Sequence, residues 1–246
     1  MKSKILSIAT ALFCSTAFAS QIILIDFGSA AGAGGTGWNT LSNNFSRTAS
    51  FSLVDSSDTA TALTIGPFVP ASIEGADADW NVGTGTNHGL QTVDFISDVP
   101  WITANAINDF VLASASSSTT SGFYIGGLAP NTEYKIDFIG VGNNQDRITN
   151  ISFSLFDISD TAAGFETVFT ENNYNVRFNP ASLTAFELQP RSFTFTTDST
   201  GQNSIRYLAN GPNVMNAMQI TVIPEPSTIL LSLLALGSMA LFRRRK

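Results

Sequence analysis

Short runs in which apolar and polar residues alternate recur through most of the chain and constrain its fold more than any other feature. Tyr134, Ile136 and Phe138 alternate with Lys135 and Asp137. A period of two is that of a strand with one buried and one exposed face. No segment between residues 20 and 223 sustains the 3.6-residue period of an amphipathic helix. The pattern therefore predicts an all-β fold.

The runs are short, and Gly, Asn, Asp, Ser and Pro separate them, as turns require. Besides the run around Tyr134, strands are expected at Ile22–Phe27, Ser50–Val54, Ala62–Ile65, Thr92–Ile96, Phe110–Ala113, Gly122–Ile125, Ser152–Leu155, Thr167–Thr170, Ser192–Thr196, Ser204–Leu208 and Ala217–Ile223. About 200 residues suit one large domain. We expect an antiparallel β-sandwich over residues 20–223, with the nineteen phenylalanines filling the space between its sheets.

Charge is distributed unevenly and argues against nucleic acid as a partner. The chain has twelve basic and nineteen acidic residues, for a net charge of −7. Six of the basic residues lie in the first four or last four positions, whereas every acid lies between Asp26 and Glu225, so the stretch between the ends carries −13. Phosphate binding needs clustered Lys and Arg, which this stretch lacks.

The first 19 residues have the organisation of a secretory signal peptide. Lys2 and Lys4 precede an apolar stretch, and the small residues Ala17 and Ala19 form a cleavage pattern before Ser20. Cys14 is the single cysteine, so cleavage after Ala19 leaves a chain without thiols. Disulfides and thiolate metal sites are then excluded.

The C-terminal end combines three features in a fixed order. Pro224, Glu225 and Pro226 are followed by an apolar run over about residues 227–242, and then by Arg243, Arg244, Arg245 and Lys246. Sixteen helical residues span about 24 Å, a short transmembrane helix that snorkelling arginines can complete. Basic residues directly after a span favour the cytoplasmic side, which places the preceding domain outside.

This order resembles the PEP-CTERM protein-sorting signal of Gram-negative bacteria. The resemblance covers residues 224–246 and implies that an exosortase in the inner membrane recognises the tail and processes it near Pro224–Pro226. It also implies export to the cell surface or to an extracellular polysaccharide matrix. A membrane anchor without processing is the alternative.

The domain between the two ends is similar to galactose-binding-like jelly-roll domains, which often occur in exported PEP-CTERM proteins. The similarity rests on Ile25–Gly28, on the turn Leu128–Tyr134 that enters a core strand, and on Asn216–Ile220. It spans roughly residues 21–223 and implies a jelly-roll-like sandwich. The Leu128–Tyr134 turn also occurs in fibronectin type III modules, and we expect Tyr134 to be buried and to pin it.

Three loops carry residue types that sugar binding uses: an aromatic face next to groups that hydrogen-bond hydroxyls. The candidate ligand residues are Trp38, Asn39, Trp80, Asn81, Asp146 and Arg147. Each Trp also fits a purely structural role.

No catalytic residue can be assigned. His88 is the single histidine and lies in a Gly- and Thr-rich segment, and no Gly-x-Ser-x-Gly nucleophile elbow is present. Glu74, Asp77 and Asp79 are a candidate for Ca²⁺, which takes oxygen ligands, although acid-rich loops are usually just solvated. No other cofactor is implied.

The sequence thus predicts a non-enzymatic exported protein, anchored in the inner membrane as a precursor and then carried to the surface or matrix, where its loops engage extracellular polysaccharide. Two alternatives remain open at this point: a secreted hydrolase acting on polysaccharide or ester substrates, and a purely structural matrix protein.

Overall fold

A computed structural model describes most of the region between the two ends of the chain. The described residues are 20–28, 35–41, 50–68, 81–83, 99–103, 106, 110–113, 120–140, 148–175, 190–199, 201–210 and 213–224. Ser20–Ile223 forms one compact unit. The predicted signal peptide and transmembrane helix lie outside the described residues. Among the described residues, no helix is long and apolar enough to cross a membrane.

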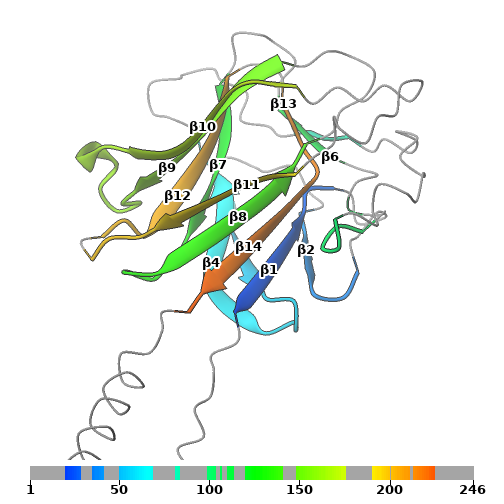
Figure 1. Cartoon of the computed structure of the whole chain (residues 1–246), viewed down its shortest axis with the longest axis horizontal. Helices are drawn as coiled ribbons and strands as arrows, with labels where there is room; N and C mark the ends of the chain where they lie inside the picture. The colour runs from blue at the N-terminus through cyan, green and yellow to red at the C-terminus, as the bar shows by residue number, and fades with distance from the viewer. Residues whose placement is uncertain are drawn as a thin grey trace, which may run out of the picture. The chain divides into compact units, whose positions relative to one another are not determined.

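Two large sheets make up the unit, and Figure 1 shows them as separate layers. Sheet A has the order β11-β8-β14-β1-β2, with β11 at Arg191–Thr196, β8 at Glu133–Ile139, β14 at Ala217–Ile223, β1 at Gln21–Asp26 and β2 at Trp38–Thr40. Sheet B has the order β10-β9-β12-β7-β4-β3, with β10 at Glu166–Asn175, β9 at Ile148–Phe156, β12 at Ser204–Asn210, β7 at Thr120–Gly126, β4 at Ala60–Pro67 and β3 at Phe51–Val54.

A third, small sheet joins β13 at Asn213–Met215, β6 at Phe110–Ala113 and β5 at Asn81–Gly83. One 3-10 turn, η3 at Thr161–Ala163, lies between β9 and β10. The all-β prediction is confirmed for the part of the chain that the structure describes. The expectation of uniformly antiparallel sheets needs one correction, because β1 and β2 pair in parallel.

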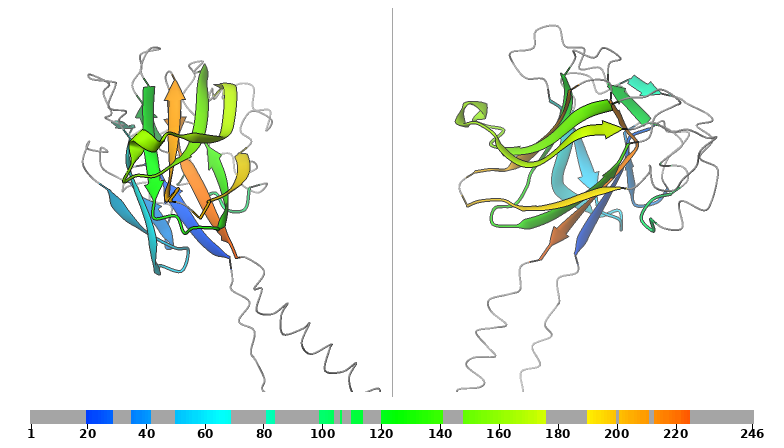
Figure 2. Two further views of the ribbon diagram at one scale, coloured as in Figure 1. Left: turned by 90° about the vertical axis from the view of Figure 1, so that its left-hand side faces the viewer. Right: turned by 45° about the horizontal axis from the view of Figure 1, so that its top comes forward.

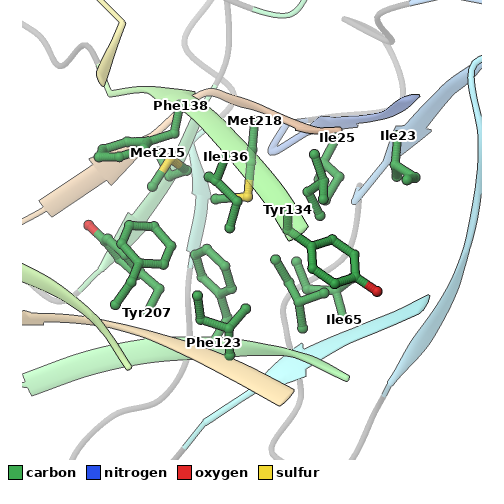
Figure 3. Packing of buried hydrophobic residues seen from close by; sticks show 14 of the residues in the cluster. Ile23, Ile25, Ile65, Phe123, Tyr134, Ile136, Phe138, Tyr207, Met215 and Met218 are labelled. Carbon is green, nitrogen blue, oxygen red and sulfur yellow. The ribbon is translucent and has the colours of Figure 1, made fainter. Parts of the chain in front are cut away.

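The alternating pattern of β8 has the predicted consequence. Tyr134, Ile136 and Phe138 are 2%, 1% and 0% exposed. They face the opposite sheet, as Figure 3 shows, where residues of β1, β8 and β14 meet Phe123, Tyr207 and Ile65 from sheet B. Figure 2 shows the two layers from two further directions. Burial of one face of each sheet against the other is the main source of stability in such a sandwich.

Tyr134 also fixes the turn that precedes its strand, as its sequence context predicts. Its hydroxyl accepts a hydrogen bond of 2.8 Å from the Ala129 amide. The Thr197 hydroxyl donates to the Ala129 carbonyl at 2.6 Å and accepts from the Thr132 amide at 3.0 Å. The turn is therefore held from two strands, and Asn131 can keep its φ of 51° there.

Candidate functional site

The predicted sorting tail follows directly on the last strand of the sandwich. β14 ends at Ile223, and Pro224 has no amide hydrogen with which to extend the ladder. β14 pairs with β1 in an antiparallel register that sets Val222 opposite Gln21. The first and last residues of the sandwich therefore lie side by side at one end of sheet A (Figure 1).

Trp38 lies on β2, at the edge of sheet A, and is half-buried. It packs against a second hydrophobic cluster, which also receives Trp101 and is made of Val99, Ile102, Ala106, Ile139 and Ala217. This cluster covers part of the outer face of sheet A, since Ile139 and Ala217 are cross-strand partners outside the main core. The indole thus contributes to packing, and its remaining exposed surface is all that a ligand can reach.

The Asn39 side chain connects the two large sheets. Its amide nitrogen donates to the Leu24 carbonyl at 2.9 Å and to the Val54 carbonyl at 2.8 Å, and its oxygen accepts from the Val54 amide at 2.8 Å. Asn39 and Leu24 both belong to sheet A and Val54 belongs to sheet B, so the two bonds to Val54 join the sheets at this edge of the sandwich. Asn39 therefore has little hydrogen-bonding capacity left for a ligand.

Most of the other predicted site residues lie outside the described residues. Asn81 is placed on β5, in the small third sheet. Those outside are Ala17, Ala19, Glu74, Asp77, Asp79, Trp80, His88, Asp146, Arg147, Glu225, Pro226, Arg243, Arg244 and Arg245. The calcium and ligand-loop assignments on these residues stay predictions.

The outer face of sheet B carries a group of residues that the sequence did not single out. Arg206 of β12 lies opposite Tyr124 of β7 and opposite Ser154 of β9. Tyr124 lies opposite Gly66 of β4. Cross-strand partners share a face, and the neighbouring positions Ile205 and Tyr207 face the core. Arg206 and Tyr124 therefore point away from the core.

Two phenylalanine rings lie near the Arg206 guanidinium, and a third packs against both of them. Its carbon atom lies 3.3 Å from the centre of the Phe165 ring and 5.4 Å from that of Phe68. Phe156 contacts both rings, with centroid distances of 5.5 Å to each. Phe165 is one of the large hydrophobic residues that remain exposed, at 38%. We refer to Phe68, Tyr124, Phe156, Phe165 and Arg206 as the Arg206 platform.

The Tyr124 ring lies against the backbone of β4. A Cβ atom built on Gly66 would come within 2.9–3.0 Å of three atoms at the far end of the Tyr124 side chain. Glycine at position 66 therefore allows the ring to lie over the strand. No hydrogen bond to the Tyr124 hydroxyl is made by the residues that the structure describes.

Arg206 is a partly buried cation without an acidic partner in the described part of the chain. The other described basic residues of the sandwich are paired: Lys135 with Asp137 at 3.0 Å and Arg191 with Glu171 at 2.8 Å. The Nε atom of Arg206 is buried and has no hydrogen-bond acceptor. Burial lowers the pKa of the Arg206 guanidinium from its ordinary value. The side chain nevertheless stays charged, because arginine is not deprotonated in proteins.

The carboxylates of Asp55 and Asp157, in two of the described turns, accept hydrogen bonds from backbone amides. Hydrogen bonds from the Thr59 and Ser57 amides lower the pKa of Asp55. The Ser159 hydroxyl and amide lower the pKa of Asp157. No group of three or more His, Cys, Asp or Glu that could hold a metal ion occurs among the residues described.

A rigid guanidinium beside exposed aromatic rings can bind an anion and stack a flat ligand. The sequence contained one signal for this surface. Leu155 and Phe156 are adjacent apolar residues at the end of an alternating strand, and Phe156 is only 2% exposed although it faces away from the core. Apolar residues on both faces of a strand indicate that both faces are covered. The partners Phe68 and Phe165 are distant in sequence, so their proximity to Arg206 was not predictable.

Comparison with solved structures gives distant likenesses. A solved structure described as "CBM4 structure and function" is 14% identical to this chain with a TM-score of 0.29, over 48% of this chain and 70% of that one. A CBM32 module of AlyQ in complex with 4,5-unsaturated mannuronic acid is 12% identical with a TM-score of 0.29, over 74% and 99%. A CBM28 module specific for non-crystalline cellulose is 7% identical with a TM-score of 0.28, over 46% and 72%. The functional arguments below rest instead on this chain's own residues.

No curated protein sequence matches the chain. A family match does exist at the C-terminal end, where residues 222–246 match the PEP-CTERM protein-sorting motif. The match begins inside β14 and includes the Pro-Glu-Pro tripeptide, the apolar run and the basic end. This chain therefore carries a PEP-CTERM protein-sorting motif directly after its β-sandwich.

Proposed function

We propose that the protein is exported across the inner membrane of a Gram-negative bacterium and released by an exosortase to the cell surface or the extracellular matrix. The observation that carries this proposal is the PEP-CTERM motif at residues 222–246, adjoining the last strand. In the proposed route, residues 1–19 direct export, and the tail holds the precursor in the membrane. Processing near Pro224–Pro226 then frees the sandwich.

The sandwich itself is proposed to be a non-enzymatic module that engages extracellular polysaccharide. An exposed aromatic ring next to an unpaired cation, as on the Arg206 platform, supports a binding role. The carboxylates of Asp55 and Asp157, in two of the described turns, accept hydrogen bonds from backbone amides, which is a structural use of these acids.

Localisation of a sorting variant tests the route. Pro224, Glu225 and Pro226 are replaced together by alanine in the native host, and cell fractions are probed with an antibody to the sandwich. We expect the precursor to stay unprocessed in the inner membrane, while the wild type reaches the surface or the medium in a shorter form. Glu133→Ala, which removes one exposed acid from the sandwich, is the matched control and should be processed normally. Normal release of the triple variant would refute the proposed route.

A further inference from the structure

The Arg206 platform has a cation that the fold desolvates and does not neutralise. Removing a guanidinium from water costs free energy unless an anion or hydrogen-bond acceptors replace the lost hydration. Phe165 and Phe68 replace part of it through their ring faces, at 3.3 and 5.4 Å. Neither ring can accept the hydrogen bonds of a guanidinium fork in its plane. The buried Nε atom without an acceptor shows that this need is unmet inside the protein.

The net negative charge of the domain makes the lack of an acidic partner for Arg206 among the described residues unusual. The region between the two ends carries −13, with 19 acidic and 6 basic residues, so acids outnumber bases there by about three to one. Lys135 and Arg191 do have such partners. The side chains opposite Arg206 on neighbouring strands are instead Ser154 and Tyr124, which are neutral. In the described part of the sandwich, Arg206 is thus a positive position on an outer face without an acidic partner.

The surroundings of the cation fit a sugar ring. Tyr124 lies over Gly66 with a hydroxyl that no described residue bonds, and Phe165 is 38% exposed. On the other side of Arg206, Thr167 continues the same row with an exposed hydroxyl. Its Oγ1 lies 3.3 Å from Oγ of Ser154, which is itself only 1% exposed. Aromatic faces suit the apolar C–H face of a pyranose, and hydroxyls suit its edge.

The row also has the direction and length of a polymer site. Thr167, Ser154, Arg206, Tyr124 and Gly66 occupy five neighbouring strands in one register. Four strand spacings of about 4.8 Å give a path of about 19 Å across the sheet. A chain of several sugar units can lie along this path, with one anionic group placed over Arg206.

We propose that the Arg206 platform binds an acidic polysaccharide through the carboxylate of a hexuronic acid unit. The guanidinium donates a fork of hydrogen bonds to the carboxylate, and the sugar ring stacks on Tyr124. This inference deepens the proposed function by naming the ligand class, and it rests on that proposal for access to extracellular polymers. None of the platform residues belongs to the predicted ligand set of Trp38, Asn39, Trp80, Asn81, Asp146 and Arg147.

Binding to polygalacturonate, a polymer of hexuronic acid, tests the inference. Full-length protein in mild detergent is titrated calorimetrically with polygalacturonate, with its fully methyl-esterified form, with dextran sulfate and with a neutral galactan. We expect measurable binding to polygalacturonate and at least tenfold weaker binding to the esterified form, because esterification removes the charge and keeps the ring. Tighter binding to dextran sulfate than to polygalacturonate would overturn the assignment to a carboxylate sugar.

Variants locate the site. Arg206→Gln should weaken polygalacturonate binding about 10- to 100-fold, the range for a lost hydrogen bond to a charged group. Tyr124→Ala should weaken it about 2- to 10-fold through lost stacking. Lys135→Gln removes the same unit of charge from sheet A and is the matched control, with unchanged affinity expected. Thermal unfolding of each variant reports whether it is folded, and Tyr124→Ala decides the case if Arg206→Gln unfolds.

The outcomes separate the two proposals. Equal losses for Arg206→Gln and Lys135→Gln would show general charge attraction and refute the platform. Binding of the neutral galactan with none of polygalacturonate would refute the hexuronate inference and leave the proposed polysaccharide role standing. Normal release of the Pro-Glu-Pro variant would refute the export route, and it would not alter binding measured in vitro.

Discussion

The hydroxyl of Tyr174 offers the sharpest test of how the sandwich is stabilised. Tyr174 is 3% exposed, and its oxygen accepts a hydrogen bond of 2.9 Å from the Gly140 amide. Both groups are buried, so water cannot replace the bond in Tyr174→Phe. Leaving a buried donor unsatisfied costs about 1–3 kcal/mol. For a domain of this size, about 2 kcal/mol lowers Tm by about 4–8 °C.

Tyr124→Phe is the matched control for this change. Its hydroxyl makes no hydrogen bond to a described residue, and its side chain is half-buried on the outer face of sheet B. The free energy of unfolding should therefore change by less than about 0.5 kcal/mol. Calorimetric unfolding of the full chain in detergent measures both variants. Equal effects of the two substitutions would refute the reasoning.

The same hydroxyl gives the prediction a pH dependence. Burial raises the pKa of Tyr174 to about 12, against the ordinary value of 10.0. The neutral form is favoured in the folded state, so stability from this group is fully present below pH 10 and is lost as the pH rises through 12. Two pH units correspond to about 2–3 kcal/mol. The stability gap between wild type and Tyr174→Phe should accordingly narrow between pH 10 and 12, and a constant gap would contradict the assigned burial of the hydroxyl.

Four further variants test other parts of the fold. Asn39→Ala should cost about 2 kcal/mol or more, because it removes three hydrogen bonds, two of which join the sheets, and thermal unfolding measures the loss. Its affinity for polygalacturonate should stay that of the wild type once the protein is folded. Gly127→Ala should destabilise the protein far more than Gly164→Ala. Both glycines have a positive φ, at 79° and 101°. At Gly127, unlike Gly164, the new methyl group would collide with the backbone oxygen of Ala62. If the denaturant midpoints ranked the two glycine variants in the opposite order, the close approach of Ala62 in β4 to Gly127 would be contradicted. Gly66→Ala should leave stability within about 1 kcal/mol while weakening sugar binding, because the flexible end of Tyr124 is what must move.

Alternation predicted the long strands well because one face of each is buried. The run Tyr134–Phe138 and the last strand, Ala217–Ile223, both lie where the pattern placed them. The three-residue strands β2, β5 and β13 were not predicted, since a segment of that length shows no period. β2 exists because Asn39 holds it between Leu24 and Val54, which is a tertiary effect.

The candidate site shows the same division between local and distant information. The sorting motif is a contiguous segment, so the order of its residues was sufficient to identify it. Alternation in β12 indicates that Arg206 points away from Tyr207, but it does not show what Arg206 meets. Phe165 and Phe68 reach it from the loop after β9 and from the end of β4. Such a site depends on strand order, which hydrophobic patterning does not determine.

The position of β14 links the fold to the proposed sorting route. β14 lies between β8 and β1 at the centre of sheet A, and six of its residues pair with β1, the first strand of the sandwich. Sheet A therefore cannot form completely until β14, which ends inside the matched motif, has joined it. On the proposed route, the tail stays in the membrane and β14 lies outside it. There β14 inserts between β1 and β8. Processing is then expected after Ile223, because a cut within β14 would shorten the central strand. A cut before Met218 would also remove Met218 and Ile220, which are 0% and 1% exposed in the core.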